Sequence, residues 1–324
     1  MFKRLRVRKD QGAPQVLNLE RPTPVSINNI SAPFVALCAG AAVTGLSPIF
    51  VRLSEVGPIA TAFYRIALAL PVLMAFMLLQ TGTPKSTPVA KSVSHGYFVA
   101  AGGFFAADLI FWHWSIQLTL VANATLLASI APVFVSIAAT VLFKERPNQT
   151  FVVGLALAIF GATVLIGKSS EFDYKHFIGD ILGISTATCY AAYLLTAKKL
   201  RQQFSATHTM FYAGLYCAAI LLPAAILSGE KLLPESDEGW TTLFFLAWVS
   251  HAAGQGLIAY ALKHLTASFS SVTLLLQPVV AGAIAWALFN ERLTLIQIVG
   301  ALIIIYGIYI CGRAARVETN ANKS

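Results

Sequence analysis

The chain has 324 residues, of which 57% are apolar and only 11% are charged, and its formal net charge is +9. A soluble domain carries about 25% charged residues, so this composition excludes an ordinary water-soluble globular protein. We interpret the basic excess as a determinant of orientation in a membrane rather than as a sign of a nucleic-acid partner.

Residues 1–30 form a basic segment that contains prolines and lacks an apolar core. A cleavable signal peptide has a short apolar stretch behind its basic start, whereas the first apolar run here is long enough to span a membrane. We therefore expect a disordered cytoplasmic tail that anchors the topology. Contact of this tail with nucleic acid or anionic lipid is the alternative that we favour less.

Ten apolar segments follow the tail, each close to the roughly 20 residues that an α-helix needs to cross a bilayer core. They lie near residues 32–52, 59–79, 95–116, 120–143, 150–167, 177–198, 206–228, 240–262, 267–289 and 295–312. The sequence therefore predicts an all-α integral membrane protein with ten transmembrane helices. The first half covers 31–167, the second half covers 177–312, and 313–324 form a short cytoplasmic tail.

The distribution of basic residues supports this arrangement. With the N-terminus in the cytoplasm, 17 of the 23 Lys and Arg residues fall in tails or connections on the cytoplasmic side, and 5 fall on the opposite side. Cytoplasmic loops of membrane proteins carry such an excess. We predict a multi-pass protein of the cytoplasmic (inner) membrane with both termini in the cytoplasm.

The sequence shows no pattern typical of a metal site or a nucleotide site. The four cysteines fall within predicted spans without metal-ligand spacing, so we interpret them as small core residues. The phosphate-binding pattern G-x-x-x-x-G-K-[ST] is absent. We therefore expect no metal, no cofactor and no direct use of ATP.

An internal repeat appears when the chain is shifted by 146 residues. Residues 131–161 align without gaps over 277–307, and the matched positions include Pro132 with Pro278, Glu145-Arg146 with Glu291-Arg292, Gly154 with Gly300 and Gly161 with Gly307. Five spans in each half are an odd number, so the second copy enters the membrane in the opposite direction. Inverted repeats of this kind are typical of secondary transporters, whose sites lie near the midplane between the halves.

In each half, a Pro-Val pair is followed by Leu-Phe-x-Glu-Arg, and this pattern resembles the EamA-type drug/metabolite transporter superfamily. The resemblance covers about residues 32–312. It implies a central cavity lined mainly by the first, third, fourth, sixth, eighth and ninth spans. The fifth and tenth spans would lie at the periphery, as scaffold or as contacts of a homodimer.

The repeated positions suggest structural roles more than substrate contact. Pro132 and Pro278 fall near the middle of the fourth and ninth spans, where proline frees a carbonyl group and bends the helix. Each bend is a gating hinge or a static kink. The spaced glycines indicate close helix packing, and the Glu-Arg pairs indicate capping and loop stabilisation.

Asp108 and Arg65 are charged residues well inside the predicted spans, and the topology places them at similar depths. A charge near the membrane midplane costs roughly 2.5 to 3.5 kcal/mol on insertion scales, so it should face a cavity or a partner. The two residues therefore form an ion pair, as a staple or an outer gate, or Asp108 meets a cationic substrate or a proton.

Other polar and aromatic residues complete the candidate lining of a substrate site. Trp112 shares a helix face with Asp108 and offers a cation–π surface, whereas we expect His113 at the membrane interface. His251 and Gln255 share a stripe of the eighth span, and His251 either couples proton movement or packs. The remaining candidates are Gln277, Tyr190, Tyr193, Asn123 and Ser129.

The sequence thus favours a secondary transporter that exports small metabolites such as amino acids or related amines by alternating access, with membrane lipid as its surroundings. An integral membrane enzyme is the first alternative, although the histidines are dispersed over different spans. A non-transporting scaffold is the second, although the internal loops are short.

Overall fold

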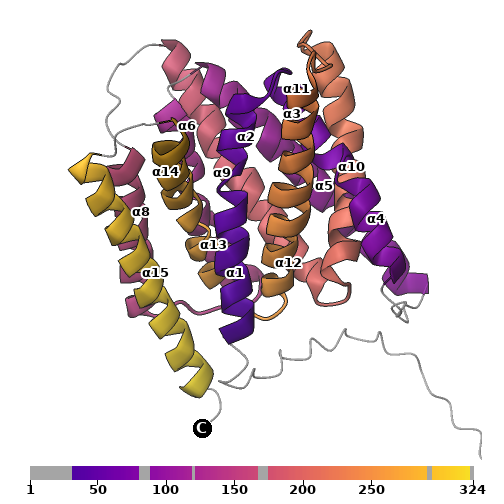
Figure 1. Cartoon of the computed structure of the whole chain (residues 1–324). Helices are drawn as coiled ribbons and strands as arrows, with labels where there is room; N and C mark the ends of the chain where they lie inside the picture. Colours follow the sequence, from indigo (N-terminus) through magenta and orange to yellow (C-terminus); the bar gives the residue numbers. More distant parts are fainter. Residues whose placement is uncertain (1–30, 80–87, 119–120, 167–173, 290–293, 322–324) are drawn as a thin grey trace, which may run out of the picture.

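The computed structural model describes residues 31–79, 88–118, 121–166, 174–289 and 294–321, and these residues contain helices and no strand (Figure 1). The elements are α1 (Ser31–Thr44), α2 (Ser47–Leu53), α3 (Pro58–Ala67), α4 (Leu70–Leu79), α5 (Pro88–Leu118), α6 (Val121–Ala128), α7 (Ala131–Leu142), α8 (Gln149–Ile166), α9 (Tyr174–Arg201), α10 (Ala206–Leu227), α11 (Asp237–Phe245), the π-helix η2 (Leu246–Gln255), α12 (Gly256–Leu262), α13 (Ala267–Thr273), α14 (Leu276–Phe289) and α15 (Leu295–Ala321).

Within the described residues, eight helical segments are long and apolar enough to cross a membrane. They are Ala32–Leu53, Pro58–Leu79, Ala124–Leu142, Phe177–Arg201, Ala206–Leu227, Asp237–Leu262, Ala267–Leu288 and Leu295–Ala315. Two expected spans lie outside this set. The apolar part of α8, Gln149–Leu165, is shorter, and α5 is not one of the eight segments.

Several of these segments consist of two helices joined by a short break. Pro132 is the second residue of α7, after the break that follows α6, and Pro278 is the third residue of α14, after the break that follows α13. Proline lacks an N–H group and its ring clashes with the carbonyl group four residues earlier, so the helix is interrupted there, as the sequence predicts. The two breaks occupy equivalent positions in the internal repeat.

The helices pack side by side into one bundle whose apolar core lies between both halves of the chain. Leu37, Ile66 and Phe105 from α1, α3 and α5 are buried together with Leu194 of α9 and Ile258 of α12. Helix α5 lies along α9, and α10 lies along both α3 and α5. The central helices of the two halves are therefore interleaved.

Helices α8 and α15 lie beside each other at one edge of the bundle (Figure 1). A Cβ atom on Gly161 would lie 2.8 Å from the carbonyl oxygen of Gly300, and one on Gly154 would lie 2.9 Å from that of Gly307. The residue numbers rise on α8 as they fall on α15, so the two helices run antiparallel. The glycines thus serve close helix packing.

Three carboxylates connect the two halves at helix N-termini, where free N–H groups and the helix dipole favour an anion. Glu145 accepts hydrogen bonds from the first two N–H groups of α13 at 2.8 and 3.1 Å. Glu230 accepts two from the first turn of α3 at 2.9 and 3.2 Å. Glu55 accepts two from the backbone just before α11 at 2.8 and 3.1 Å. The capping role predicted for Glu145 is confirmed, whereas Glu291 lies outside the described residues.

Candidate substrate site

Two buried charged residues of opposite sign lie in the centre of the first half. Arg65 of α3 is 7% exposed and Asp108 of α5 is 8% exposed. The two side chains are close enough to interact electrostatically, which agrees with their similar predicted depths. No ion pair within 4.0 Å joins the two side chains, although both lie in the described part of the chain. The predicted direct ion pair is therefore not formed in this structure.

Arg65 also has neighbours from the second half of the chain. Its charge acts on Tyr190 and Tyr193 of α9 and on His251 of η2. Its Nε–H group has no hydrogen-bond partner among the described residues. The guanidinium group is thus the point at which the polar residues of the two halves approach one another.

The two tyrosines of α9 line the same region. Tyr193 is buried, and its ring stacks on that of Phe105 with centroids 4.5 Å apart. Tyr190 is half-buried, and its side chain lies near the side-chain amides of Gln255 and Gln277. The structure therefore brings α9, η2 and α14 together through tyrosine and glutamine side chains.

Helix η2 places His251 and Gln255 in the bundle interior, where both are buried. Its turns are wider than those of an α-helix, and such π-helical insertions are frequent at functional sites. The ring of His251 stacks on that of Phe105 with centroids 5.7 Å apart, and its Nδ1 atom has no partner within the described chain.

Phe105 was not among the predicted site residues. It occupies the repeat position equivalent to that of His251, since the two numbers differ by 146. Equivalent residues of two repeats can meet only near the axis that relates the repeats. The alignment of Phe105 with His251 is therefore the sequence signal that could have placed this ring in the centre.

Gln277 and Ser129 lie at the two helix breaks, but they differ in their hydrogen bonding. The Nε2 group of Gln277 has no hydrogen-bond partner in the described structure. The hydroxyl group of Ser129 donates to the carbonyl oxygen of Thr125 at 2.8 Å, which satisfies it within its own helix segment. Asn123 lies on α6, and its side chain is outside the described part of the chain.

The outer turns of α5 differ in part from the prediction. Trp112 is half-buried, and its ring contacts that of His113 edge-on at 5.0 Å. The prediction of an interfacial His113 is wrong, because His113 is only 3% exposed and its Nδ1 atom bonds to the carbonyl oxygen of Leu109 at 2.6 Å. Helix α9 covers this part of α5, as the bond from Ser115 to the carbonyl oxygen of Gly179 shows. Trp114 is 49% exposed.

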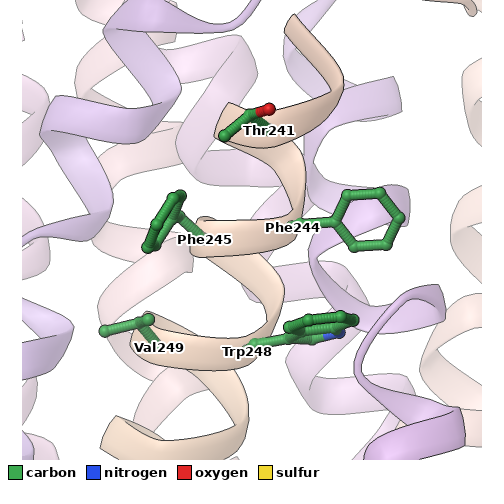
Figure 2. Close-up of a pocket in the computed structure, with 5 residues that line it drawn as sticks. All are labelled: Thr241, Phe244, Phe245, Trp248 and Val249. Atoms are coloured by element: carbon green, nitrogen blue, oxygen red, sulfur yellow. The ribbon is translucent and has the colours of Figure 1, made fainter. Parts of the chain in front are cut away.

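A concave region lies on the outer face of α11 and η2, away from the central cluster. Figure 2 shows its lining residues, with Phe245 and Val249 on one side of the helix and Phe244 and Trp248 on the other. The indole N–H of Trp248 donates to the carbonyl oxygen of Leu68 at 3.0 Å. The groove is apolar and exposed, so it does not share the chemistry of the central cluster.

Metal chemistry has no evident ligand set in the described residues, since no three His, Cys, Asp or Glu side chains there lie close enough to hold an ion. The central cluster instead offers one guanidinium group, one carboxyl group, two tyrosines and amide groups inside an apolar bundle. Such a set can hold a small polar molecule by charge and hydrogen bonds.

Comparisons with known proteins give relatives for almost the whole described chain. An uncharacterized transporter of Archaeoglobus fulgidus is 27% identical over 86% of this chain and 95% of its own. A probable amino-acid metabolite efflux pump of Salmonella typhimurium is 27% identical over 78% of this chain and 86% of its own. A probable terminal-alkyne amino-acid exporter of Streptantibioticus cattleyicolor is 28% identical over 59% of this chain and 64% of its own.

A solved crystal structure of a protein with 17% sequence identity shares the fold, with a TM-score of 0.76 over 88% of this chain and 98% of that chain. The profile of the EamA-like transporter family matches residues 32–167 and again residues 177–313. The two matches coincide with the two halves that carry the internal repeat. The chain therefore belongs to the EamA-like transporter family and is a multi-pass membrane transporter.

Proposed function

We propose that the chain is a secondary exporter of amino-acid metabolites or related amines across the cytoplasmic membrane. Its ten transmembrane helices would form two inverted five-helix repeats with both termini in the cytoplasm. The substrate would bind between the repeats, and the cavity would open alternately to the two sides. The printed descriptions of two relatives as amino-acid exporters support this substrate class.

One observation carries the proposal: polar residues from both halves meet in the centre of an apolar bundle. Arg65 and Asp108 come from the first half, and Tyr190, His251 and Gln255 come from the second. Buried polar groups in a membrane protein are costly and face a cavity or a partner. A site shared by two repeats changes its access when the repeats move against each other.

The arrangement of the peripheral helices supports inverted repeats. Helices α8 and α15 occupy equivalent positions of the internal repeat and run antiparallel along their glycine faces. In Figure 1, α1 begins and α15 ends at the same end of the bundle. Together with the excess of basic residues in the tails, this supports two cytoplasmic termini.

We assign the two helix breaks before Pro132 and Pro278 as the hinges of the transport cycle. Because each break already interrupts the backbone hydrogen bonds, a change of angle there costs less than bending an intact helix. Equivalent breaks in both halves would let each half close one side of the cavity.

A homodimer would use the outward faces of α8 and α15 rather than their glycines. The glycine faces are occupied by the contact between the two helices. The outward faces carry exposed apolar residues, among them Phe160 and Leu302, which contact membrane lipid when the protein is a monomer.

Efflux from proteoliposomes tests the proposal. Purified protein is reconstituted with an equimolar mixture of the twenty protein amino acids and a set of primary amines, and their release is measured against protein-free liposomes. We expect at least one amino acid or amine to leave faster from the proteoliposomes. Conversion of a compound without translocation would favour the membrane enzyme, and release equal to that of protein-free liposomes would favour the scaffold.

Asp108→Asn provides the site variant for this assay, and Asp237→Asn provides a matched control in the exposed first turn of α11. We expect the first change to slow efflux and the second to leave it unchanged. Equal rates for both variants would contradict the assignment of the central cluster as the site.

A further inference from the structure

The arrangement of Arg65 and Asp108 differs from that of a closed salt bridge. Both side chains are more than nine-tenths buried, and each feels the other's charge. Their charged atoms are nevertheless not within 4.0 Å of each other, a distance that the described residues would have shown as an ion pair. Two separated buried charges are costly, because their mutual attraction repays the cost of desolvation only when the pair is close and fully hydrogen-bonded.

The groups around this open pair have unused hydrogen-bonding capacity. Arg65 Nε, His251 Nδ1 and Gln277 Nε2 are buried and lack partners among the described residues. Native proteins leave few buried polar atoms without partners, and such atoms require an explanation. A polar ligand that enters between the charges would supply hydrogen-bond partners for these atoms.

We infer that Arg65 and Asp108 are the two poles of a head-group site for a zwitterion, with Arg65 holding a carboxylate and Asp108 holding an ammonium group. The inference rests on the proposed transport function and narrows its substrate to α-amino acids rather than simple amines or carboxylic acids. The planar guanidinium group suits a carboxylate, which it can bind through two parallel hydrogen bonds. The Tyr193–Phe105–His251 ring stack lies beside this head-group site.

The discrimination follows from the cost of an unpaired buried charge. A ligand with only an ammonium group leaves Arg65 without a counter-charge, and a ligand with only a carboxylate leaves Asp108 without one. An unsatisfied charged group costs enough that the mismatched ligand should bind about 10- to 100-fold more weakly than the zwitterion.

The test compares one amino acid with two analogues in reconstituted proteoliposomes. The parent is the fastest-leaving amino acid of the twenty, and the analogues are its carboxamide, which lacks the carboxylate, and its deaminated acid, which lacks the ammonium group. We expect both analogues to leave at least about tenfold more slowly than the parent. An analogue whose efflux rate lies within threefold of that of the parent would overturn the head-group site, as would export of amines without any amino acid. Neither result would contradict the proposed transport function.

Two variants separate the poles. Asp108→Asn should abolish the preference for the parent over the deaminated acid while keeping the preference over the carboxamide, and Arg65→Gln should do the reverse. This crossed pattern cannot arise from misfolding, which slows all three compounds together. Uniform slowing in either variant, with monodisperse protein of unchanged thermal stability, would overturn the inference. Asp237→Asn and Arg313→Gln are the exposed controls.

Discussion

At the centre of the bundle, the ring of Phe105 stacks on those of Tyr193 and His251 with an interplanar angle of 16° in both cases. Phe105 is 4% exposed, whereas its neighbour Phe104 is 40% exposed. We predict that Phe105→Ala lowers the free energy of unfolding by about 3–5 kcal/mol, because a buried ring is replaced by a cavity. Denaturant titration in detergent micelles measures this loss.

Phe104→Ala is the control for this prediction, since it removes the same atoms from the outside of the same helix. We expect a change well below that of Phe105→Ala. Similar losses in the two variants would show that the central ring stack makes no special contribution to stability.

Glu55 offers a residue whose protonation affects stability outside the membrane-spanning segments. A hydrogen bond from the Ser236 hydroxyl group and two from backbone N–H groups hold the pKa of Glu55 below the ordinary carboxyl value. The folded protein therefore prefers the ionised form. This stabilisation is fully present above the unfolded pKa and is lost as the pH falls through the lower folded pKa.

We predict that Glu55→Gln is less stable than the unchanged protein at neutral pH and that the difference vanishes in acid. Thermal unfolding in detergent across this pH range measures both curves. Glu238→Gln, in the exposed first turn of α11, should keep the pH dependence of the unchanged protein. A constant difference between Glu55→Gln and the unchanged protein at every pH would contradict the predicted linkage.

Part of the candidate site could be predicted from the sequence, whereas the rest depends on which helices pack against each other. Arg65 and Asp108 could be placed at one depth from the sequence, because both depths follow from span direction and helix rise. The coverage of His113 could not, because it depends on which helix packs over that face of α5. The stack of Phe105 on His251 required the axis that relates the repeats.

Among the elements, the N-terminus of α13 depends on residues from two other elements. The carboxylate of Glu145 accepts from the first two N–H groups of α13 and from the Ser268 hydroxyl group at 2.6 Å. Lys198 of α9 lies 3.4 Å from the same carboxylate and donates to the carbonyl oxygen of Leu265 at 2.6 Å. Helix α13 is thus tied to the loop after α7 and to the end of α9.

We predict that Glu145→Ala lowers the free energy of unfolding by about 2 kcal/mol, since it removes a helix cap and leaves a half-buried lysine without its carboxylate. Hydrogen exchange should accelerate at the amides of Ala267 and Ser268 in particular. Arg146→Ala changes an exposed neighbour and should leave both amides protected. Unchanged exchange at these amides in Glu145→Ala would contradict the capping role.

At the scale of helices, some features could be predicted from the sequence and others could not. The helix breaks could be predicted from Pro132 and Pro278, because proline removes a backbone hydrogen bond and its ring clashes with the preceding turn. Proline is not sufficient for a break, since Pro223 lies inside the continuous helix α10. The π-helical turns of η2 could not, because the residues Leu246–Gln255 contain no proline and read as an ordinary apolar helix. Helix η2 continues directly from α11 and packs against α1 and α3, and the sequence of η2 alone does not show these neighbours.

For the whole molecule, the internal repeat predicted which positions are equivalent, but it did not predict which of them touch. Gly154 is equivalent to Gly300 in sequence, yet its close contact is Gly307, and Gly161 is the residue that meets Gly300. This exchange of partners follows from a two-fold relation between α8 and α15. The glycine contacts therefore join the two halves at the edge of the bundle.

Gly300→Ala tests whether this contact holds the halves together. The new Cβ atom would lie 2.5 Å from the backbone nitrogen of Leu165 and 2.9 Å from the carbonyl oxygen of Gly161. Backbone atoms cannot move aside as a flexible side chain can, so α8 and α15 must separate along their length. We predict a loss of about 1–3 kcal/mol in the free energy of unfolding, as for an overpacked core.

Gly282→Ala is the matched control, because a Cβ atom on this glycine of α14 meets nothing within 4 Å. Alanine is favoured over glycine inside a helix by up to about 1 kcal/mol, so this variant should be as stable as the unchanged protein or more stable. Opposite signs for the two substitutions, measured by denaturant titration in micelles, are the expected result. If Gly300→Ala also stabilised the protein, the close approach of α8 and α15 could not be what joins the two halves. The antiparallel glycine contact would then not support the inverted-repeat arrangement.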